Sequence, residues 1–245
     1  MKENKIWNDY LPEDMQEHWT VYECLKESED SSTFLVKETA TGILCVLKWG
    51  RNRQTEFLRN EMEIMEKMAD RKLSGVPKAY RIFEENGEVY LVREYIEGMS
   101  LAQMVLQKGG ISEAEICRIS RKICQTAEQF QNPDEPMIHR DIKPENIVVT
   151  PGGEVVFIDF GTMRSYKKDG SRDTFVVGTR GTAAPEQYGY TQTDQRTDVY
   201  AIGQTMLYMV SESYEMNQLS ECAVSRRMKK IIEKACSFEP DKRYG

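Results

Sequence analysis

The 245-residue sequence lacks a long apolar run, is poor in histidine and carries no excess of positive charge. No stretch approaches the roughly 18 consecutive apolar residues that a membrane-spanning helix needs, so we expect no membrane segment in this chain. Residues 1–15 have neither an apolar core nor a small-residue cleavage site, which excludes a secretory signal. The formal net charge of -7 argues against a nucleic-acid-binding surface, so we expect no nucleic-acid partner.

The six cysteines lack the spacing of a metal site. None of them forms a C-x-x-C pair, and the two histidines, His18 and His139, lie far apart in the sequence. Free thiols in a reducing compartment are the expected state. We therefore predict a cytoplasmic protein, with the alternative that a membrane anchor follows Gly245 in a longer chain.

The chain changes character between residues 95 and 100. Before this point, strand-like runs rich in β-branched and aromatic residues alternate with turn signals, and Asn86-Gly87 is typical of a hairpin. One helical pattern at 54–68 lies among them, which predicts a small sheet with one helix packed on it. After Gly98 helices are expected at 100–107 and 112–130, the second with Ser112 as its N-cap. The strand-like runs are 21–25, 33–37, 43–49, 80–84, 89–95, 147–150 and 155–158.

Three motifs carry the chemistry. They are the string His139-Arg140-Asp141-Ile142-Lys143-Pro144-Glu145-Asn146, then Asp159-Phe160-Gly161 after a strand-like run, then Ala184-Pro185-Glu186. One tripeptide alone would be weak evidence, but the whole set in this order is the signature of protein kinases. The chain resembles this family over about residues 21–243. The runs at 136–147 and 178–189 are most similar to bacterial eukaryotic-like serine/threonine kinases.

The resemblance implies an α+β, two-lobed protein kinase fold. An N-terminal extension would span 1–20, a small antiparallel β lobe with one main helix 21–95, and a larger, mainly α-helical lobe 96–245. A cleft between lobes is a common place for a nucleotide. We expect the final helix of the family to lie beyond Gly245.

The same resemblance implies an activity. The chain would transfer the γ-phosphate of ATP to serine or threonine hydroxyls of proteins, including its own. The metal would be Mg²⁺, or alternatively Mn²⁺. A homodimer would serve autophosphorylation.

The resemblance also assigns the catalytic residues. Asp141 would orient the attacking hydroxyl or accept its proton, and Lys143 would contact the transferring phosphate. Asn146 and Asp159 would bind magnesium, a hard cation that prefers carboxylate and amide oxygens. Thr179 matches the threonine that serine/threonine kinases place beside the base, and with Lys143 it argues against a tyrosine kinase.

The first half of the chain would supply a lysine on the third strand and a glutamate on the helix. Lys48 lies where the phosphate-binding lysine belongs. The pattern around the helix selects Glu61 as its partner, with Glu56 and Glu63 as rivals.

Backbone groups of Glu94 and Ile96 would meet the adenine edge of ATP. Before this hinge the family has an apolar or small polar residue, whereas this chain has Arg93. A buried arginine is costly unless it is paired. We therefore expect Arg93 to reach an acidic group such as Glu61, or to turn outward.

The segment 159–186 would be the activation segment. Arg140 is the type of residue that pairs with a phosphorylated side chain there. Thr174 is the candidate phosphosite, and Ser165 and Ser171 are weaker ones.

Further residues match structural positions of the family. Asp198 would hold the catalytic loop, and Glu186 and Arg243 would form a buried ion pair. His139 would pack within the loop without a catalytic role.

One part of the family pattern fails. In residues 26–31 the three glycine positions fall on Lys26, Ser28 and Ser31, although glycine normally lets backbone N–H groups approach the phosphates. The loop also holds three carboxylates, those of Glu27, Glu29 and Asp30. This departure keeps open a pseudokinase that acts as a nucleotide-binding or allosteric scaffold. A small-molecule phosphotransferase is disfavoured, because such enzymes lack the string at 139–146.

Overall fold

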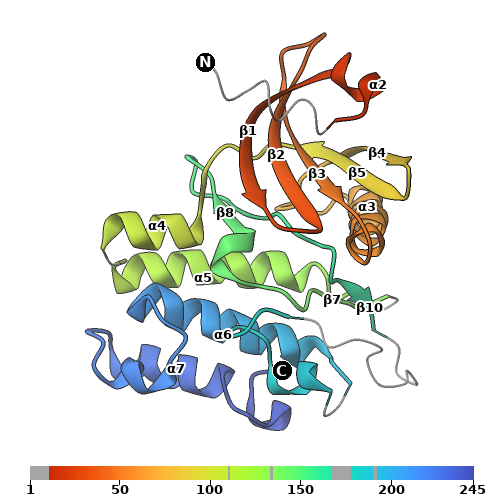
Figure 1. Cartoon of the computed structure of the whole chain (residues 1–245). Coiled ribbons are helices and arrows are strands. Elements are labelled where there is room, and N and C mark those ends of the chain that lie inside the picture. Colours follow the sequence, from red (N-terminus) through yellow and green to blue (C-terminus); the bar gives the residue numbers. More distant parts are fainter. Residues whose placement is uncertain (1–10, 110, 133–134, 167–177, 190–191) are drawn as a thin grey trace. The chain divides into compact units, whose positions relative to one another are not determined.

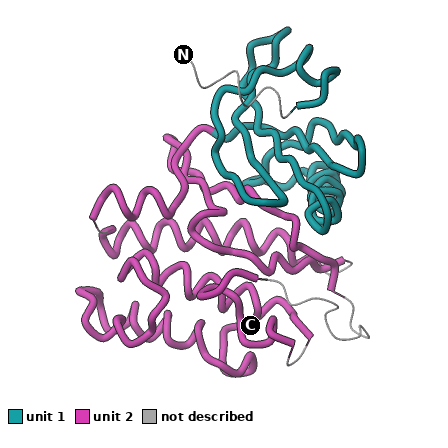
Figure 2. Tube along the Cα trace, viewed as in Figure 1, with its two compact units in different colours: residues 1–96 teal, residues 97–245 magenta. Residues whose placement is uncertain are grey.

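The computed structural model describes residues 11–109, 111–132, 135–166, 178–189 and 192–245 (Figure 1). The chain divides into two compact units, residues 1–96 and 97–245 (Figure 2). The first holds an antiparallel sheet with one main helix, and the second is mainly helical. The predicted α+β protein kinase fold is confirmed.

The sheet of the first unit has the strand order β1-β2-β3-β5-β4, with every neighbouring pair antiparallel. Asn86 and Gly87, which join β4 to β5, have φ of 51° and 82°. Positive φ at both positions matches the twist of a two-residue hairpin, so the predicted hairpin is confirmed. The strands are β1 Trp19–Glu27, β2 Ser31–Glu38, β3 Leu44–Gly50, β4 Ala79–Glu85 and β5 Glu88–Glu94.

The chain before β1 contributes to the apolar core of this unit. Leu11 and Met15, the latter on the short helix α2 (Glu13–Gln16), pack with buried residues of four strands. Trp19 meets Phe83 edge to face at 5.4 Å between ring centroids, and its burial explains why β1 begins earlier than the predicted residue 21. Trp7, which we expected to pack on the body with Trp19, lies outside the described residues.

Strand β3 begins one residue later than predicted. Ile43 is 54% exposed and precedes the strand. The apolar run 43–47 therefore buries only its later residues, Cys45, Val46 and Leu47.

Helix α3 (Gln54–Asp70) packs against β3, β4 and β5. Its buried stripe includes Leu58, Ile64, Met65 and Met68, spaced as one helical face. Glu61 lies within this stripe, where burial of a charge requires a partner.

The second unit is built on four α-helices among the residues described: α4 (Leu101–Lys108), α5 (Glu113–Glu128), α6 (Gln195–Ser211) and α7 (Arg226–Ala235). Helix α6 packs between α5 and α7 (Figure 1). Ser112 caps α5 by accepting the N–H of Glu115 at 3.3 Å, which confirms the predicted N-cap. No described helix is both long and apolar enough to cross a bilayer.

Short strands and 3₁₀ turns complete this unit and carry its polar residues. The strands are β6 (Met99–Ser100), β7 (Met137–Ile138), β8 (Ile147–Val149), β9 (Val155–Phe157) and β10 (Arg164–Ser165). The 3₁₀ turns are η1 (Pro144–Asn146), η2 (Pro185–Tyr188), η3 (Met216–Ser220) and η4 (Pro240–Lys242).

Candidate active site

The first unit contains a buried lysine–glutamate pair. Strand β3 presents Lys48 and helix α3 presents Glu61, and the Lys48 Nζ lies 2.8 and 2.7 Å from the two Glu61 carboxylate oxygens. Their side chains are 11% and 1% exposed. The rivals Glu56 and Glu63 are exposed. Because each buried charge needs the other, the pair joins the helix to the strand.

The loop between β1 and β2 is closed by side chains instead of glycines. The N–H of Ser28 donates to the Ser31 carbonyl at 2.8 Å, and the two hydroxyls are 2.8 Å apart. Asp30 accepts from the Arg51 Nε at 3.1 Å, while the Arg51 Nη2 donates to the Glu29 carbonyl at 2.9 Å. One of the three loop carboxylates is thus paired with a cation. Nothing in the sequence pattern indicated that partner.

The end of β5 holds the residues expected at the hinge. Arg93 is 3% exposed, so the alternative that it turns outward is wrong. Its Nη1 donates to the Glu94 carbonyl at 3.0 Å, which places the guanidinium along its own strand. A carbonyl oxygen has two lone pairs, so this bond leaves Glu94 able to accept another donor. Pairing of Arg93 with an acidic group stays a prediction, and Ile96 is half-buried.

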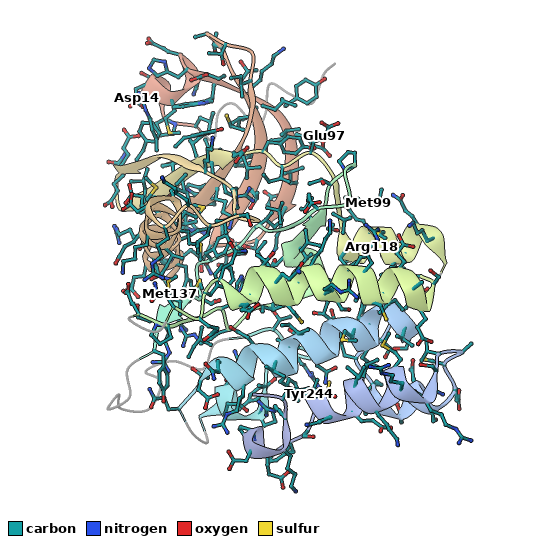
Figure 3. All side chains as sticks on the ribbon, turned by 180° about the vertical axis from the view of Figure 1, so that it is seen from behind. Asp14, Glu97, Met99, Arg118, Met137 and Tyr244 are labelled. Atoms are coloured by element: carbon teal, nitrogen blue, oxygen red, sulfur yellow. The ribbon has the colours of Figure 1, made fainter. Side chains whose placement is uncertain are left out.

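In the second unit, strand β7, which begins at Met137 (Figure 3), leads into the loop at 139–146. Asp198 on α6 accepts the backbone N–H groups of His139 and Arg140, each at 2.9 Å. Arg140 has φ of 66°, a conformation that costs a non-glycine residue on the order of 1 kcal/mol. The two hydrogen bonds to one carboxylate offset this cost and fix the loop.

Asp141, Lys143 and Thr179 form a closed triangle of contacts. The Thr179 hydroxyl donates to the Asp141 Oδ1 at 2.7 Å and accepts from the Lys143 Nζ at 2.6 Å. The Lys143 Nζ also donates to the Asp141 Oδ2 at 2.7 Å. The three residues come from the loop at 139–146 and from the segment before η2, 38 positions apart for Asp141 and Thr179.

Asn146 and Asp159 meet the chemical requirement for a divalent cation. The Asn146 Nδ2 donates to the Asp141 carbonyl at 3.0 Å and to its Oδ2 at 2.9 Å, so its amide oxygen is the atom left for a cation. Asp159 follows β9 in the sequence, and the Ile158 N–H donates to the Asn146 carbonyl at 3.0 Å. Within the described residues no cluster of three or more His, Cys, Asp or Glu suits a metal. Magnesium fits this donor set, because it usually takes one or two protein carboxylates together with substrate phosphates.

His139 is part of an aromatic cluster. It is completely buried, with ring centroids 5.3 Å from Phe157 and 5.4 Å from Phe160. Burial lowers the His139 pKa to about 4, so the imidazole is neutral at pH 7. Burial also raises the pKa of Asp198, to about 6, against the opposing effect of its two N–H donors.

Arg243 uses all five of its N–H donors. Its Nη1 and Nη2 donate to the two carboxylate oxygens of Glu186 at 2.7 and 2.9 Å, and both side chains are buried. The other three donors reach backbone carbonyls, those of Arg196, Ser237 and Phe238. The motif matching indicated the ion pair but not the three carbonyls.

Gln187 is a positioning residue that the motifs did not indicate. Its Nε2 donates to the Arg140 carbonyl at 2.7 Å, and its Oε1 accepts the Ala184 N–H at 2.9 Å. It therefore ties the loop at 139–146 to the segment after Thr179. No spacing in the sequence signals such a contact.

The expected regulatory residues divide between described and undescribed parts of the chain. Thr174 and Ser171 lie outside the described residues. The Ser165 hydroxyl donates to Glu135 at 2.8 Å. The Arg140 Nε donates to the Thr162 carbonyl at 2.8 Å, beside the start of the activation segment.

Comparison with known proteins agrees with this geometry. The model of the protein kinase domain matches residues 20–245. Serine/threonine-protein kinase D of Synechocystis is 30% identical over 87% of this chain and 47% of its own length. Serine/threonine-protein kinase B of Synechocystis is 30% identical over 69% of this chain and 33% of its own length. For serine/threonine-protein kinase PknA of Nostoc the values are 26%, 77% and 36%.

The chain thus spans about half or less of these curated relatives. The family match nevertheless covers both compact units, including the strand–helix pair of the first and the triangle of contacts in the second. The chain belongs to the protein kinase family.

Proposed function

We propose that this chain transfers the γ-phosphoryl group of ATP to serine and threonine hydroxyls of proteins, its own included. The contact that supports this most is the Thr179 hydroxyl held between Lys143 and Asp141 at 2.6 and 2.7 Å. It keeps a cation and a proton acceptor together, which is what transfer to an alcohol requires.

The reaction we propose is a displacement at the γ-phosphorus. The acceptor hydroxyl oxygen forms a bond to this phosphorus, and the bond to the β–γ bridging oxygen breaks, so ADP leaves. The hydroxyl proton passes to the Asp141 carboxylate. The Lys143 ammonium stabilises the negative charge on the transferring phosphoryl oxygens. Thr179 and Asn146 hold the carboxylate in place.

Nucleotide binding uses both units. Lys48, oriented by Glu61, binds phosphate oxygens, and backbone groups of Glu94 and Ile96 meet adenine. Asn146 and Asp159 hold Mg²⁺, with Mn²⁺ as the alternative metal. The bound metal neutralises phosphate charge.

Regulation would act through the activation segment. Arg140 pairs with phosphorylated Thr174 in this proposal, and two copies of the chain phosphorylate one another as a homodimer. We place the protein in the cytoplasm.

One observation favours a second candidate, a catalytically weak scaffold. Glycine is absent from residues 26–31, and Glu27 and Glu29 add negative charge to a loop that the family places over phosphates. Such a scaffold would bind nucleotide or a partner without transferring phosphate.

The test is phosphoamino-acid analysis of an unstructured protein acceptor after incubation with the chain and Mg-ATP. We expect phosphoserine and phosphothreonine, no phosphotyrosine, and no transfer by Asp141→Asn. Thermal stabilisation by nucleotide without transfer would favour the scaffold.

A further inference from the structure

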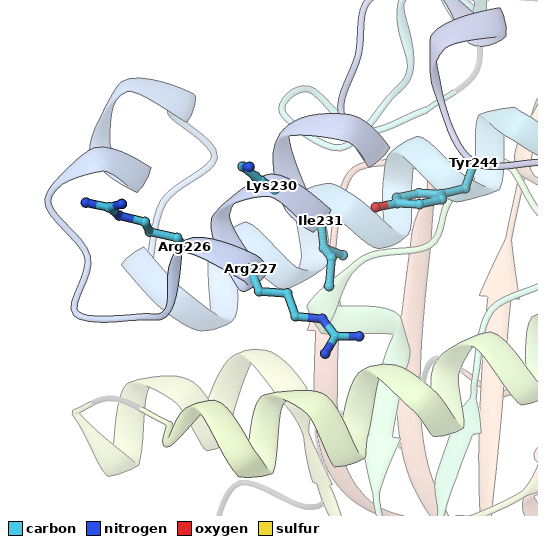
Figure 4. A pocket seen from close by; sticks show the side chains of 5 residues that line it. All are labelled: Arg226, Arg227, Lys230, Ile231 and Tyr244. Atoms are coloured by element: carbon cyan, nitrogen blue, oxygen red, sulfur yellow. The ribbon is translucent and has the colours of Figure 1, made fainter.

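Helix α7 forms one wall of an open hollow on the second unit. The hollow has a volume of about 730 Å³ (Figure 4). This is within the range of about 300–1,000 Å³ that is usual for ligand sites. The lining residues are Arg226, Arg227, Lys230, Ile231 and Tyr244.

The three cations of this hollow are not neutralised within the protein. Arg226, Arg227 and Lys230 are exposed and make no hydrogen bond or ion pair with any residue that the structure describes. Other cations of the same helix are engaged: Lys229 donates to the Ser220 carbonyl at 2.7 Å. The chain has 40 acidic and 33 basic residues, so three unpaired cations around one hollow run against its overall charge.

The helix that presents these cations is firmly held. The Ser225 hydroxyl caps α7 and also donates to Glu113 of α5 at 2.6 Å, while its N–H donates to the same carboxylate at 2.7 Å. Met228 and Ile232 on the opposite face are buried. The charged face therefore sits on a rigid support, which lowers the entropy cost of binding.

The apolar part of the hollow is also built. Ile231 is half-buried between the cations, and its side chain lies on the same side of α7 as that of Arg227 (Figure 4). The Lys234 Nζ lies 4.3 Å from the centre of the Tyr244 ring, a cation–π contact that orients the ring. The hollow thus offers both positive charge and apolar surface.

We propose that this hollow binds a short acidic peptide segment of a partner protein. Its Asp or Glu carboxylates contact Arg226, Arg227 and Lys230, since a guanidinium matches a carboxylate with two parallel hydrogen bonds. An apolar side chain between the acids packs on Ile231 and Tyr244. This site does not depend on the proposed phosphoryl transfer, because neither the catalytic loop nor α3 contributes to it.

Two other anionic partners fit less well. An interfacial helix inserts its apolar face into a membrane, but the apolar face of α7 is buried in the protein. The net charge of -7 opposes binding to a nucleic acid or to a broad anionic surface. A concave site with three cations suits a peptide better than either.

The test is fluorescence anisotropy with a labelled Glu-Glu-Leu-Glu-Glu peptide and its glutamine counterpart Gln-Gln-Leu-Gln-Gln. We compare the wild-type chain with Arg227→Glu and with the matched control Arg121→Glu, which reverses an exposed arginine on α5 without a described partner. Arg227→Glu should weaken acidic-peptide binding at least about tenfold, roughly the loss of one charge-assisted contact. Arg121→Glu should change it less than twofold, and Ile231→Ala should weaken it severalfold.

Each other outcome overturns the proposal. Equal losses in Arg227→Glu and Arg121→Glu would show attraction by overall charge only. Equal binding of the glutamine peptide would exclude carboxylate recognition, and absence of binding would exclude the site. Stronger Arg227-dependent binding to phosphatidylserine vesicles than to the peptide would assign the hollow to lipid. Circular dichroism of each variant ensures that the folded chain is compared.

Discussion

The Thr179 hydroxyl donates a hydrogen bond of 2.7 Å to the Asp141 carboxylate and accepts one of 2.6 Å from the Lys143 ammonium. One hydroxyl group therefore fixes the base and the cation of the proposed reaction relative to each other. The contact bridges two segments that are far apart in the chain. It also makes Thr179 a direct probe of the proposed chemistry.

We expect Thr179→Val to lower kcat by about 10–100-fold, because a hydrogen bond to a charged group contributes about 1.5–3 kcal/mol. KM for ATP should change little, since Thr179 orients Asp141 and Lys143 and is assigned no nucleotide contact. Thr179→Ser keeps the hydroxyl and should retain most activity. Steady-state kinetics checks this, and equal losses in the two variants would contradict the role of the hydroxyl.

The Lys48–Glu61 pair predicts non-additive stabilities. Lys48→Met leaves a carboxylate that is 1% exposed without its ammonium partner, and should cost about 3–5 kcal/mol of unfolding free energy. The double variant Lys48→Met/Glu61→Leu removes both charges and should recover most of that loss, although phosphoryl transfer stays abolished. Urea unfolding of the two single variants and the double variant measures the coupling. Simple addition of the single losses would show that the pair is not coupled.

Arg51 lies at the tip of the glycine-free loop. Arg51→Ala removes the cation that pairs with Asp30, so the proposed nucleotide site gains uncompensated negative charge. We expect KM for ATP to rise severalfold, while the free energy of unfolding changes by less than about 1 kcal/mol because the pair is exposed. Arg53→Ala, which removes an exposed arginine of the adjoining turn, is the control. An unchanged KM in Arg51→Ala would mean that the loop does not contact the nucleotide.

Local patterns were sufficient to predict many elements of the fold. Asn86-Gly87 specifies its hairpin because both residues tolerate positive φ. The apolar spacing of α3 predicted the helix, and family motifs then selected Glu61, the glutamate that Lys48 contacts.

Contacts that depend on tertiary packing could not be read in this way. The five donors of Arg243 reach carbonyls whose positions follow from the packing of α6 and the turns after α7. Asp30 and Arg51 meet because β2 pairs with β3, and no spacing rule links them. The two-residue strands β6, β7 and β10 are too short to show a period.

His139 predicts a pH dependence of stability. Its pKa is about 4 when buried, below the ordinary 6.5, so the unfolded chain binds the extra proton between these values. The stability contribution of neutral His139 is present above pH 6.5 and is lost as pH falls toward 4. The difference in unfolding free energy between wild type and His139→Phe should therefore grow as pH rises through this window. Urea unfolding at several pH values measures it, and a constant difference would contradict the buried neutral state.

The most direct test of the account is the intact mass of the purified chain after incubation with Mg-ATP, beside Asp141→Asn. Dephosphorylation before the incubation removes phosphate acquired during expression. The account predicts that the wild type gains whole phosphoryl groups and that Asp141→Asn gains none. Equal phosphorylation of both proteins, or of neither, would contradict catalysis through Asp141.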